Sequence, residues 1–232
     1  MGSQPADRPS PARITFSAAA GIAGLAALLF VPAGRIDWFA GWLYLAIVIV
    51  YFAANYVYLN RVNPELIAHR MRMGKGTKRW DKVWLWLNTP VFLSIHVVAG
   101  LDAERFGWSQ MPEWLWPVGL AVFVAGSVLV SWSMGVNPFF EKTVRIQSER
   151  GHRVIDTGPY RIVRHPGYLG FFGWLVSTPL LLGSWWAFAP AALSLFSFIG
   201  RTALEDRTLR RELTGYEDYA RRVRYRILPG VW

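Results

Sequence analysis

Six long apolar runs, each close to the length that crosses a bilayer, alternate with polar segments along this chain. A run of about 20 apolar residues spans the hydrocarbon core as a helix, because a helix satisfies its own backbone hydrogen bonds there. The pattern therefore predicts an all-α, polytopic membrane protein with six transmembrane helices, five being the alternative count. The runs cover residues 14–33, 38–59, 83–101, 114–134, 166–182 and 185–203.

Basic residues are distributed unevenly between the polar segments. All of the 25 Lys and Arg residues except Arg35 and Arg105 fall in the segments that six crossings place on one side of the membrane. The positive-inside rule assigns that side to the cytoplasm, so both termini are predicted to be cytoplasmic. This arrangement requires an even number of crossings. Anionic membrane lipids, rather than nucleic acid, are the expected partners of the charge.

Only Gly183 and Ser184 separate the fifth and sixth runs, which predicts a tight helical hairpin. The fifth run would reach about 26 Å as a helix, enough for a thin bilayer core. A stripe of small residues follows its start and would allow the close approach of another helix or of a ligand. The stripe consists of Gly167, Gly170 and Gly173.

The sequence after the sixth run turns polar but keeps helix-forming residues. The helix is therefore expected to continue beyond the membrane, to break near Gly215 and to resume. Tyr216, Tyr219 and Val223 would then share one face.

These boundaries divide the chain into three parts. Residues 1–13 are polar and predict a disordered tail, from which no removable signal peptide is expected. Residues 14–134 hold the first four runs, and residues 135–232 are expected to form the catalytic and cofactor-binding region. Composition agrees with a membrane protein, since 17% of residues are charged against about 25% in soluble domains. The chain has no cysteine, which excludes disulfides and cysteine-based metal sites.

A cationic cluster stands directly before the fifth run, in "YRIVRHPGYLG". Pro166 suits the first position of a helix, which places His165 at the N-cap. The free N–H groups of a helix start attract anions, and Arg161 and Arg164 add positive charge. The cluster predicts a pocket for a carboxylate or phosphate at the cytoplasmic end of the helix. Lipid phosphate is the plainer alternative.

A second group, in "RTALEDRTL", lies where the sixth run leaves the membrane. Arg201 and Glu205 are four residues apart and are expected to pair. The tight hairpin would bring Glu205 towards Arg164 and His165. Ionisable residues near membrane depth are candidate site residues, whereas a solvated helix exit is the alternative.

A long connection joins the fourth and fifth runs. Long ordered loops are often functional, and this one carries Asn137, Gln147, His152 and Asp156 on the side of the two charged groups. Gly158 and Pro159 predict a turn near its end. No metal-ligand spacing stands out, so no metal site is expected. His69 and His96 have no obvious partner and are interpreted as structural.

From Asn137 to Gly230 the chain resembles the superfamily of isoprenylcysteine carboxyl methyltransferases and phospholipid methyltransferases, which are integral membrane enzymes. The matching text is "GHRVIDTGPYRIVRHPGYLG", the apolar hairpin and "LEDRTLRRELTGYEDYARRVRYRILPG". The family's paired glutamates correspond to Leu204-Glu205 or to Glu205-Asp206, a register that stays open. The resemblance implies S-adenosylmethionine as cofactor and Arg201 and Glu205 as catalytic residues. It implies cofactor binding by Gln147, His152, Gly158, Tyr160, Arg164, His165, Pro166, Tyr168 and Glu205.

The resemblance leaves the methyl acceptor open. A lipidic or small membrane-accessible molecule is implied, such as an isoprenylcysteine carboxylate, a phospholipid amine or a thiol. The end "YARRVRYRILPGVW" also resembles membrane reductases of sterols and isoprenoids, so an NADPH-dependent reductase is one alternative function. A non-catalytic lipid-binding protein is another. A prokaryotic inner membrane is the favoured location.

Overall fold

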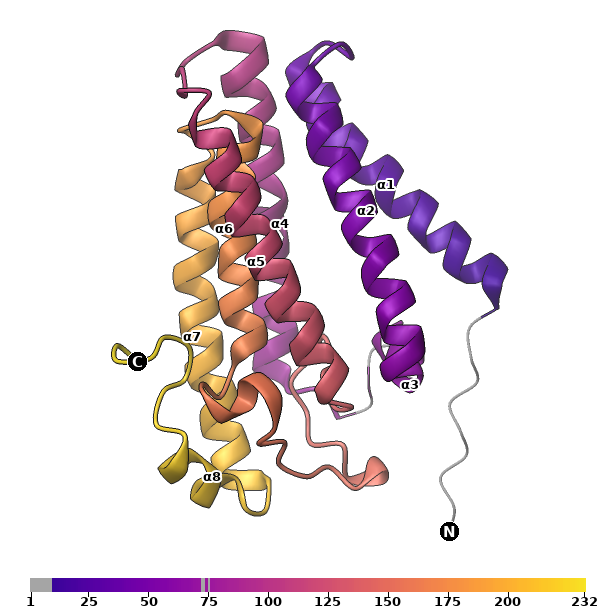
Figure 1. Ribbon diagram of the computed structural model, residues 1–232, viewed down its shortest axis with the longest axis vertical. Helices are drawn as coiled ribbons and strands as arrows, with labels where there is room; N and C mark the ends of the chain where they lie inside the picture. Colours follow the sequence, from indigo (N-terminus) through magenta and orange to yellow (C-terminus); the bar gives the residue numbers. More distant parts are fainter. Residues whose placement is uncertain (1–9, 72–73, 75) are drawn as a thin grey trace.

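The computed structural model describes residues 10–71, 74 and 76–232, and all regular elements within them are helical (Figure 1). This confirms the all-α prediction. The long helices are α1 (Pro11–Ala33), α2 (Phe39–Val62), α4 (Arg79–Gly100), α5 (Leu115–Val136), α6 (Pro166–Leu182) and α7 (Phe188–Glu212). The short elements are α3 (Pro64–Arg70), α8 (Tyr216–Arg222), a π-helix η1 (Leu101–Phe106) and two 3₁₀ turns, η2 (Ser148–Arg150) and η3 (Gly158–Arg161).

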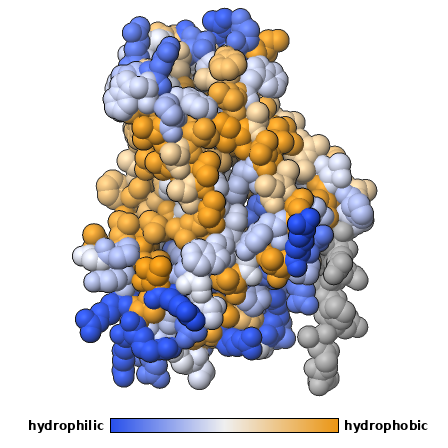
Figure 2. Space-filling model, in the orientation of Figure 1, coloured by the Kyte–Doolittle hydropathy of each residue, from blue (hydrophilic) through white to orange (hydrophobic). Residues whose placement is uncertain are grey.

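Each of the six apolar runs corresponds to one long helix of the described residues, and no run extends beyond its helix by more than three residues. Among those residues, four segments are long and apolar enough to cross a membrane: α1, α2, Arg79–Phe106 and α5. Helix α6 is apolar but shorter, and α7 is apolar only in its first half. Figure 2 shows a hydrophobic band across the middle of the molecule, between more hydrophilic ends. The polytopic class is confirmed, while the count of six crossings stays a prediction.

The two basic residues set apart by the sequence lie together at one end of the bundle. Arg35, between α1 and α2, forms an ion pair of 3.4 Å with Glu104 of η1, the element that also holds Arg105. We call the opposite end, where α2 ends and α4 begins, the basic end. The orientation of this end towards the cytoplasm stays a prediction.

Close packing of α5 against α6 explains two glycines of the predicted stripe. A Cβ atom on Gly170 would lie 2.6 Å from the carbonyl oxygen of Gly126, and one on Gly173 would lie 3.2 Å from the Gly126 Cα. Gly167 instead faces the ring of Phe140. The two helices run side by side in Figure 1, and their contact requires residues without side chains.

The predicted helix boundaries need three corrections. Helix α1 begins at Pro11, inside the predicted tail, whose residues 1–9 lie outside the described residues. The loop expected from Asp102 to Glu113 starts as the π-helix η1. Helix α7 begins at Phe188, so five residues rather than two connect the hairpin, and Gly183 turns the chain with φ +73°.

The hairpin connection is held by a buried carboxylate. Asp102 accepts hydrogen bonds from Ser184 Oγ at 2.6 Å and from the backbone N–H of Ser109 at 2.8 Å. Its side chain therefore ties η1 to the start of α7.

The C-terminal end of the chain behaves as the sequence predicted. Helix α7 extends from the bundle to Glu212, Gly215 adopts φ +81°, and α8 follows. Tyr216, Tyr219 and Val223 pack in one cluster. The chain then returns to α6, because the backbone N–H groups of Arg164 and His165 donate to the carbonyls of Tyr225 (3.0 Å) and Arg226 (2.8 Å).

Candidate functional site

A cavity of about 770 Å³ lies at the basic end, between α2, α4, α6, α7 and the loop that follows α5. This volume is in the usual range for binding sites of small molecules. Most of the predicted site residues meet in its wall, although they come from three separate stretches of the chain. They are Gln147, His152, Tyr160, Arg164, His165, Tyr168, Arg201 and Glu205.

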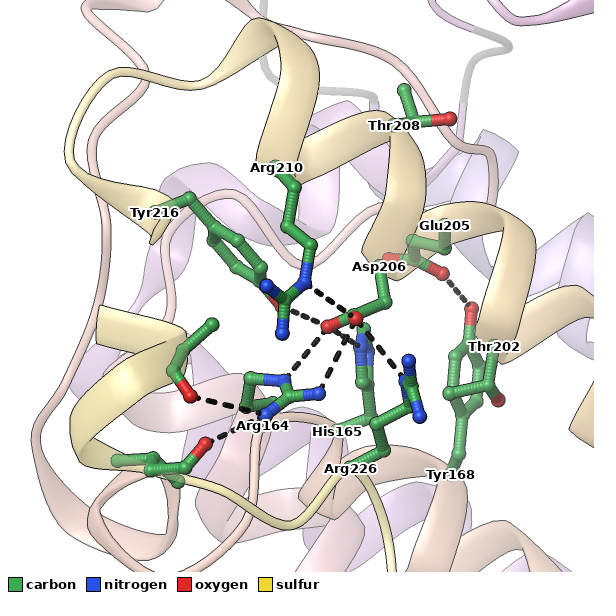
Figure 3. A network of polar contacts seen from close by, with 12 residues as sticks. Arg164, His165, Tyr168, Thr202, Glu205, Asp206, Thr208, Arg210, Tyr216 and Arg226 are labelled. Atoms are coloured by element: carbon green, nitrogen blue, oxygen red, sulfur yellow. Dashed lines mark hydrogen bonds and ion pairs between the residues drawn. The ribbon is translucent and has the colours of Figure 1, made fainter. Parts of the chain in front are cut away.

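Asp206 of α7 is the centre of a buried charge network beside this cavity (Figure 3). Its carboxylate accepts from Arg164 Nε at 2.7 Å and from the Tyr216 hydroxyl at 3.1 Å. Arg210 and Arg226 each approach it at 3.1 Å. Burial favours the neutral acid, but His165 and Arg164 outweigh it and hold the pKa of Asp206 well below its usual range. The sequence placed Glu205 towards Arg164 and His165, but the carboxylate that Arg164 binds is that of Asp206.

Arg164 is fully engaged by the protein itself. Its Nη1 donates to the carbonyls of Val223 (2.7 Å) and Arg224 (2.8 Å), while Nε and Nη2 donate to Asp206. The guanidinium is buried and holds the C-terminal segment against α7. Its predicted contact with a cofactor carboxylate would therefore have to displace existing bonds.

His165 has the opposite character. It caps α6 and stacks on Tyr168 with 5.7 Å between ring centroids. Its Nε2 is buried, has no hydrogen-bond partner among the described residues, and lies 3.6 Å from Asp206 Oδ1. The start of α6 offers fewer free donors than expected, since the N–H groups of Tyr168 and Leu169 donate to the His165 carbonyl. His165 Nε2 is thus a buried polar atom at this helix start that has no hydrogen bond among the described residues.

Tyr168 joins the two predicted catalytic residues. Its hydroxyl donates to the Glu205 carboxylate and accepts a hydrogen bond from Arg201 Nη1. The predicted direct pair of Arg201 with Glu205 is replaced by this bridge. Both charged groups face the cavity, so an anion and a cation could be bound on either side of one phenol.

Arg201 is anchored by an acid that the sequence analysis did not single out. Asp81, in the first turn of α4 and fully buried, accepts from Arg201 Nε at 2.7 Å. The indole of Trp84 lies 4.7 Å from the guanidinium carbon. The signal that could have found Asp81 is its position as a lone acid in the basic stretch "KRWDK".

The loop residues Gln147 and His152 line the cavity but differ in how their side chains are held by the protein. Gln147 donates to the Phe139 carbonyl at 2.8 Å and accepts from Arg150 at 2.6 Å, so both ends of its amide are engaged. His152 packs against the Phe139 ring. Burial, followed by the charges of Arg145 and Arg150, lowers the pKa of His152 to about 4. The imidazole is therefore neutral at physiological pH.

The remaining predicted residues have supporting positions. Gly158 (φ +55°) packs under Trp132 and Pro166 starts α6; neither is part of the cavity wall. Tyr160 lines the cavity, and its hydroxyl accepts from Asn137 at 3.0 Å. His96, interpreted as structural, does find a partner in the Tyr44 hydroxyl at 3.1 Å.

A second cavity of about 450 Å³ adjoins the first one and lies further into the helical bundle. The two share five aromatic wall residues, and the second reaches as far as α1. Its wall is almost entirely apolar. The shared residues are Tyr51, Phe52, Phe92, Phe171 and Trp174.

Comparison with known proteins yields consistent matches. The model of the isoprenylcysteine carboxyl methyltransferase family matches residues 119–211. A rice protein named "Probable protein-S-isoprenylcysteine O-methyltransferase" is 32% identical over 46% of this chain and 57% of its own length. The protein-S-isoprenylcysteine O-methyltransferase of Saccharomyces cerevisiae is 38% identical over 42% of this chain and 39% of its own length. The chain thus spans about half the length of these relatives.

A solved structure shows the same fold. It is described as the eukaryotic intramembrane Ras methyltransferase ICMT, and it covers 89% of this chain and 73% of its own with a TM-score of 0.55. Sequence identity is 22%, so this match concerns the arrangement of the helices alone. It includes the N-terminal helices, which the family model does not reach.

Proposed function

We propose that the chain is a membrane methyltransferase of the isoprenylcysteine carboxyl methyltransferase family, whose model matches residues 119–211, and that it esterifies the carboxylate of an isoprenylcysteine with S-adenosylmethionine. The observation that carries the proposal is the Arg201–Tyr168–Glu205 bridge in the wall of a cavity that shares part of its wall with an apolar one. The two relatives described above are both named for isoprenylcysteine.

The residues at the basic end fit a small zwitterion such as S-adenosylmethionine. The buried His165 Nε2, which has no partner among the described residues, can donate to a carboxylate when it carries a proton. Glu205 lies on the same wall and suits an ammonium group. Aromatic rings of the cavity wall suit a sulfonium through their π faces. Arg164 is left out of this assignment because Asp206 and backbone carbonyls occupy it.

The reaction itself requires positioning more than acid–base chemistry. When bound, the cofactor would supply an electrophilic methyl group on sulfur; an O–CH₃ bond forms at the acceptor carboxylate, and the S–CH₃ bond breaks. Arg201 would orient and partly neutralise that carboxylate, held in place by Asp81 and Trp84. Holding two reactants in line is the main source of acceleration in such a transfer.

The apolar cavities suit the prenyl chain of the acceptor. From Trp84 the wall passes through Phe198 and Phe171 to Phe92 and reaches the second cavity. Burial of a long hydrocarbon chain there would contribute about 0.8 kcal/mol for each CH₂ group. A lipid-borne acceptor and a water-soluble cofactor could then meet at Arg201.

The test uses purified protein in lipid nanodiscs, methyl-labelled S-adenosylmethionine and N-acetyl-S-farnesylcysteine. We expect a base-labile methyl ester to form. His165→Ala and Glu205→Ala should weaken cofactor binding. Arg201→Lys should slow methyl transfer and leave cofactor binding unchanged. Absence of ester formation together with stabilisation of the protein by NADPH, or by anionic lipid alone, would contradict the proposal.

The cytoplasmic orientation of the basic end is part of the same proposal, since the cofactor is a cytoplasmic metabolite. The prokaryotic location stays a prediction, and the two relatives described above come from eukaryotes.

A further inference from the structure

Asn88 is a buried polar side chain with no partner, placed at membrane depth in the cavity wall. It lies nine residues into α4, its exposed fraction is 6%, and its Oδ1 has no hydrogen-bond partner among the described residues. Asn55 of α2, on the other side of the same cavity, also has a buried and unpartnered Oδ1. At 1.5 Å per residue, both lie about 10–14 Å in from the basic ends of their helices.

Other polar side chains of the bundle do find partners within the protein. Asn63 donates to the Met134 carbonyl at 2.8 Å, and Trp174 donates to Ser127 at 2.9 Å. A carboxamide buried without a hydrogen bond is destabilising, and more so where the membrane offers no water. Polar groups retained at such depth indicate a functional role. Because Asn88 faces the cavity, a bound molecule can supply the missing partner.

The position of Asn88 along α4 fixes which part of an acceptor it would meet. Trp84, one turn before it, stacks on Arg201, and Phe92, one turn after it, belongs to the apolar passage. Each turn advances the wall by about 5–6 Å. Asn88 therefore lies between the proposed carboxylate position and the prenyl passage.

An N-acylated isoprenylcysteine has a polar group at that place. Its secondary amide is attached to the same carbon as the carboxylate, and the thioether and prenyl chain extend from the neighbouring carbon. A secondary amide offers one N–H and one C=O group. The side-chain amide of asparagine can accept from that N–H or donate to that C=O. Because the two groups of a trans amide point in opposite directions, Asn88 can bond one of them, which leaves the other for Asn55.

We propose that Asn88 is an acceptor-positioning residue that hydrogen-bonds the amide next to the reacting carboxylate, with Asn55 as a second contact. This inference rests on the proposed function and narrows it. The enzyme would select prenylated cysteine within a peptide or another N-acyl group, and would discriminate against prenylated acids that lack the amide. A site built for a hydrogen bond rejects a ligand that lacks it, because the buried site group then stays unpaired.

The experiment compares two acceptors on the full-length protein in nanodiscs. N-acetyl-S-farnesylcysteine contains the amide; S-farnesyl-3-thiopropionic acid has the same carboxylate, thioether and prenyl chain without it. We expect wild-type kcat/KM to be about tenfold or more higher for the first acceptor. Asn88→Leu, which has a similar shape, should lower kcat/KM about tenfold for the amide acceptor, mainly through KM. The same variant should leave kcat/KM for the thiopropionic acid and the KM for S-adenosylmethionine unchanged.

A matched control is Ser194→Ala. Ser194 Oγ is also buried and unpartnered among the described residues, but it lines neither cavity. This variant should leave the ratio between the two acceptors unchanged, and Asn55→Leu should shift it in the same direction as Asn88→Leu. An equal loss for both acceptors, or no loss for either, would overturn the inference. If the wild-type protein methylated neither acceptor, the proposed function itself would be overturned.

Discussion

Asp81 of α4 and Arg201 of α7, 120 residues apart in the chain, form a buried ion pair with 2.7 Å between Oδ1 and Nε. The second carboxylate oxygen of Asp81 accepts the backbone N–H of Val144 at 2.7 Å. One acid from the N-terminal half therefore fixes both the proposed acceptor-binding guanidinium and the loop that closes the cavity. Residues outside the range of the family match thus determine the geometry of the site.

Asp81→Asn should abolish most methyl transfer while leaving cofactor binding largely intact. The amide keeps the shape of the carboxylate but leaves the Arg201 charge unpaired, and breaking a buried pair destabilises by about 3–5 kcal/mol. We expect kcat to fall at least tenfold, because a small displacement of a positioning group has a large effect on rate. Single-turnover transfer and calorimetric binding of S-adenosylmethionine measure the two effects separately.

The control for this variant is an ion pair on the surface nearby. Lys78 and Glu212 lie 2.7 Å apart with partly exposed side chains, and such pairs contribute about 0–1 kcal/mol. Glu212→Gln should leave transfer unchanged. A similar loss of activity in both variants would show that general loosening of the basic end, rather than the position of Arg201, limits the rate.

The helical architecture could be predicted from hydropathy and from the proline and glycine residues that start or end helices. The runs of apolar residues predicted all six long helices, because the length of a membrane crossing leaves few alternatives. Pro166 at the start of α6 and Gly215 before α8 were also located correctly, since proline and glycine have strong local preferences.

Pairings between side chains could not be read in the same way. The spacing of four residues on a helix suggested that Arg201 binds Glu205. In the structure Arg201 instead binds Asp81 and Tyr168, which are distant from it in the sequence. Arg164 forms its ion pair with Asp206 rather than with Glu205. Adjacent residues on a helix point about 100° apart, so only one of these two acids can face Arg164. Asn88 does not stand out in the sequence, because its lack of a partner is a property of the packed bundle.

Asp206→Asn should loosen the C-terminal segment at neutral pH. The low pKa of Asp206 in the folded protein means that its ionised form stabilises the fold. That contribution is complete above the unfolded-state pKa of about 3.9 and is lost as pH falls below it towards the folded-state value. We therefore expect faster hydrogen exchange at Arg164 and His165, whose N–H groups bond to the returning segment, in the variant at pH 7.

The difference in stability between wild type and Asp206→Asn should narrow when unfolding is followed below pH 4. Asp218→Asn provides the comparison, since Asp218 is exposed on α8. A stability difference that is constant from pH 7 to pH 2 would contradict the assignment of an ionised carboxylate to the centre of the network.

His152 should make the protein sensitive to mild acid. Burial and nearby arginines lower the pKa of its imidazole to about 4, against about 6.5 when unfolded. The unfolded state therefore takes up a proton first, and stability falls as pH decreases from 6.5 to 4. His152→Gln should flatten this part of the curve of melting temperature against pH. An unchanged curve would mean that His152 titrates normally in the fold.

Gly170→Ala should separate α5 from α6. A Cβ atom there would lie 2.6 Å from the Gly126 carbonyl and 2.8 Å from a methyl group of Val130. Overpacking of this kind typically costs about 1–3 kcal/mol, so the melting temperature should fall by several degrees. Gly200→Ala is the matched control, because a Cβ atom on Gly200 of α7 would meet no atom within 4 Å and alanine favours the helix.

Tyr168→Phe should uncouple Arg201 from Glu205 without emptying the cavity wall. The ring and its stacking on His165 remain, while the hydroxyl that both charged groups share is lost. Arg201 keeps Asp81, so its position should change little, but Glu205 loses the one donor that the structure gives it among the described residues. We expect the Kd for S-adenosylmethionine to change, since Glu205 is the proposed partner of its ammonium. The rate of single-turnover transfer at saturating cofactor should then fall less than in Asp81→Asn. The opposite order, a larger rate loss in Tyr168→Phe at unchanged Kd, would assign the phenol rather than the guanidinium to the orientation of the acceptor.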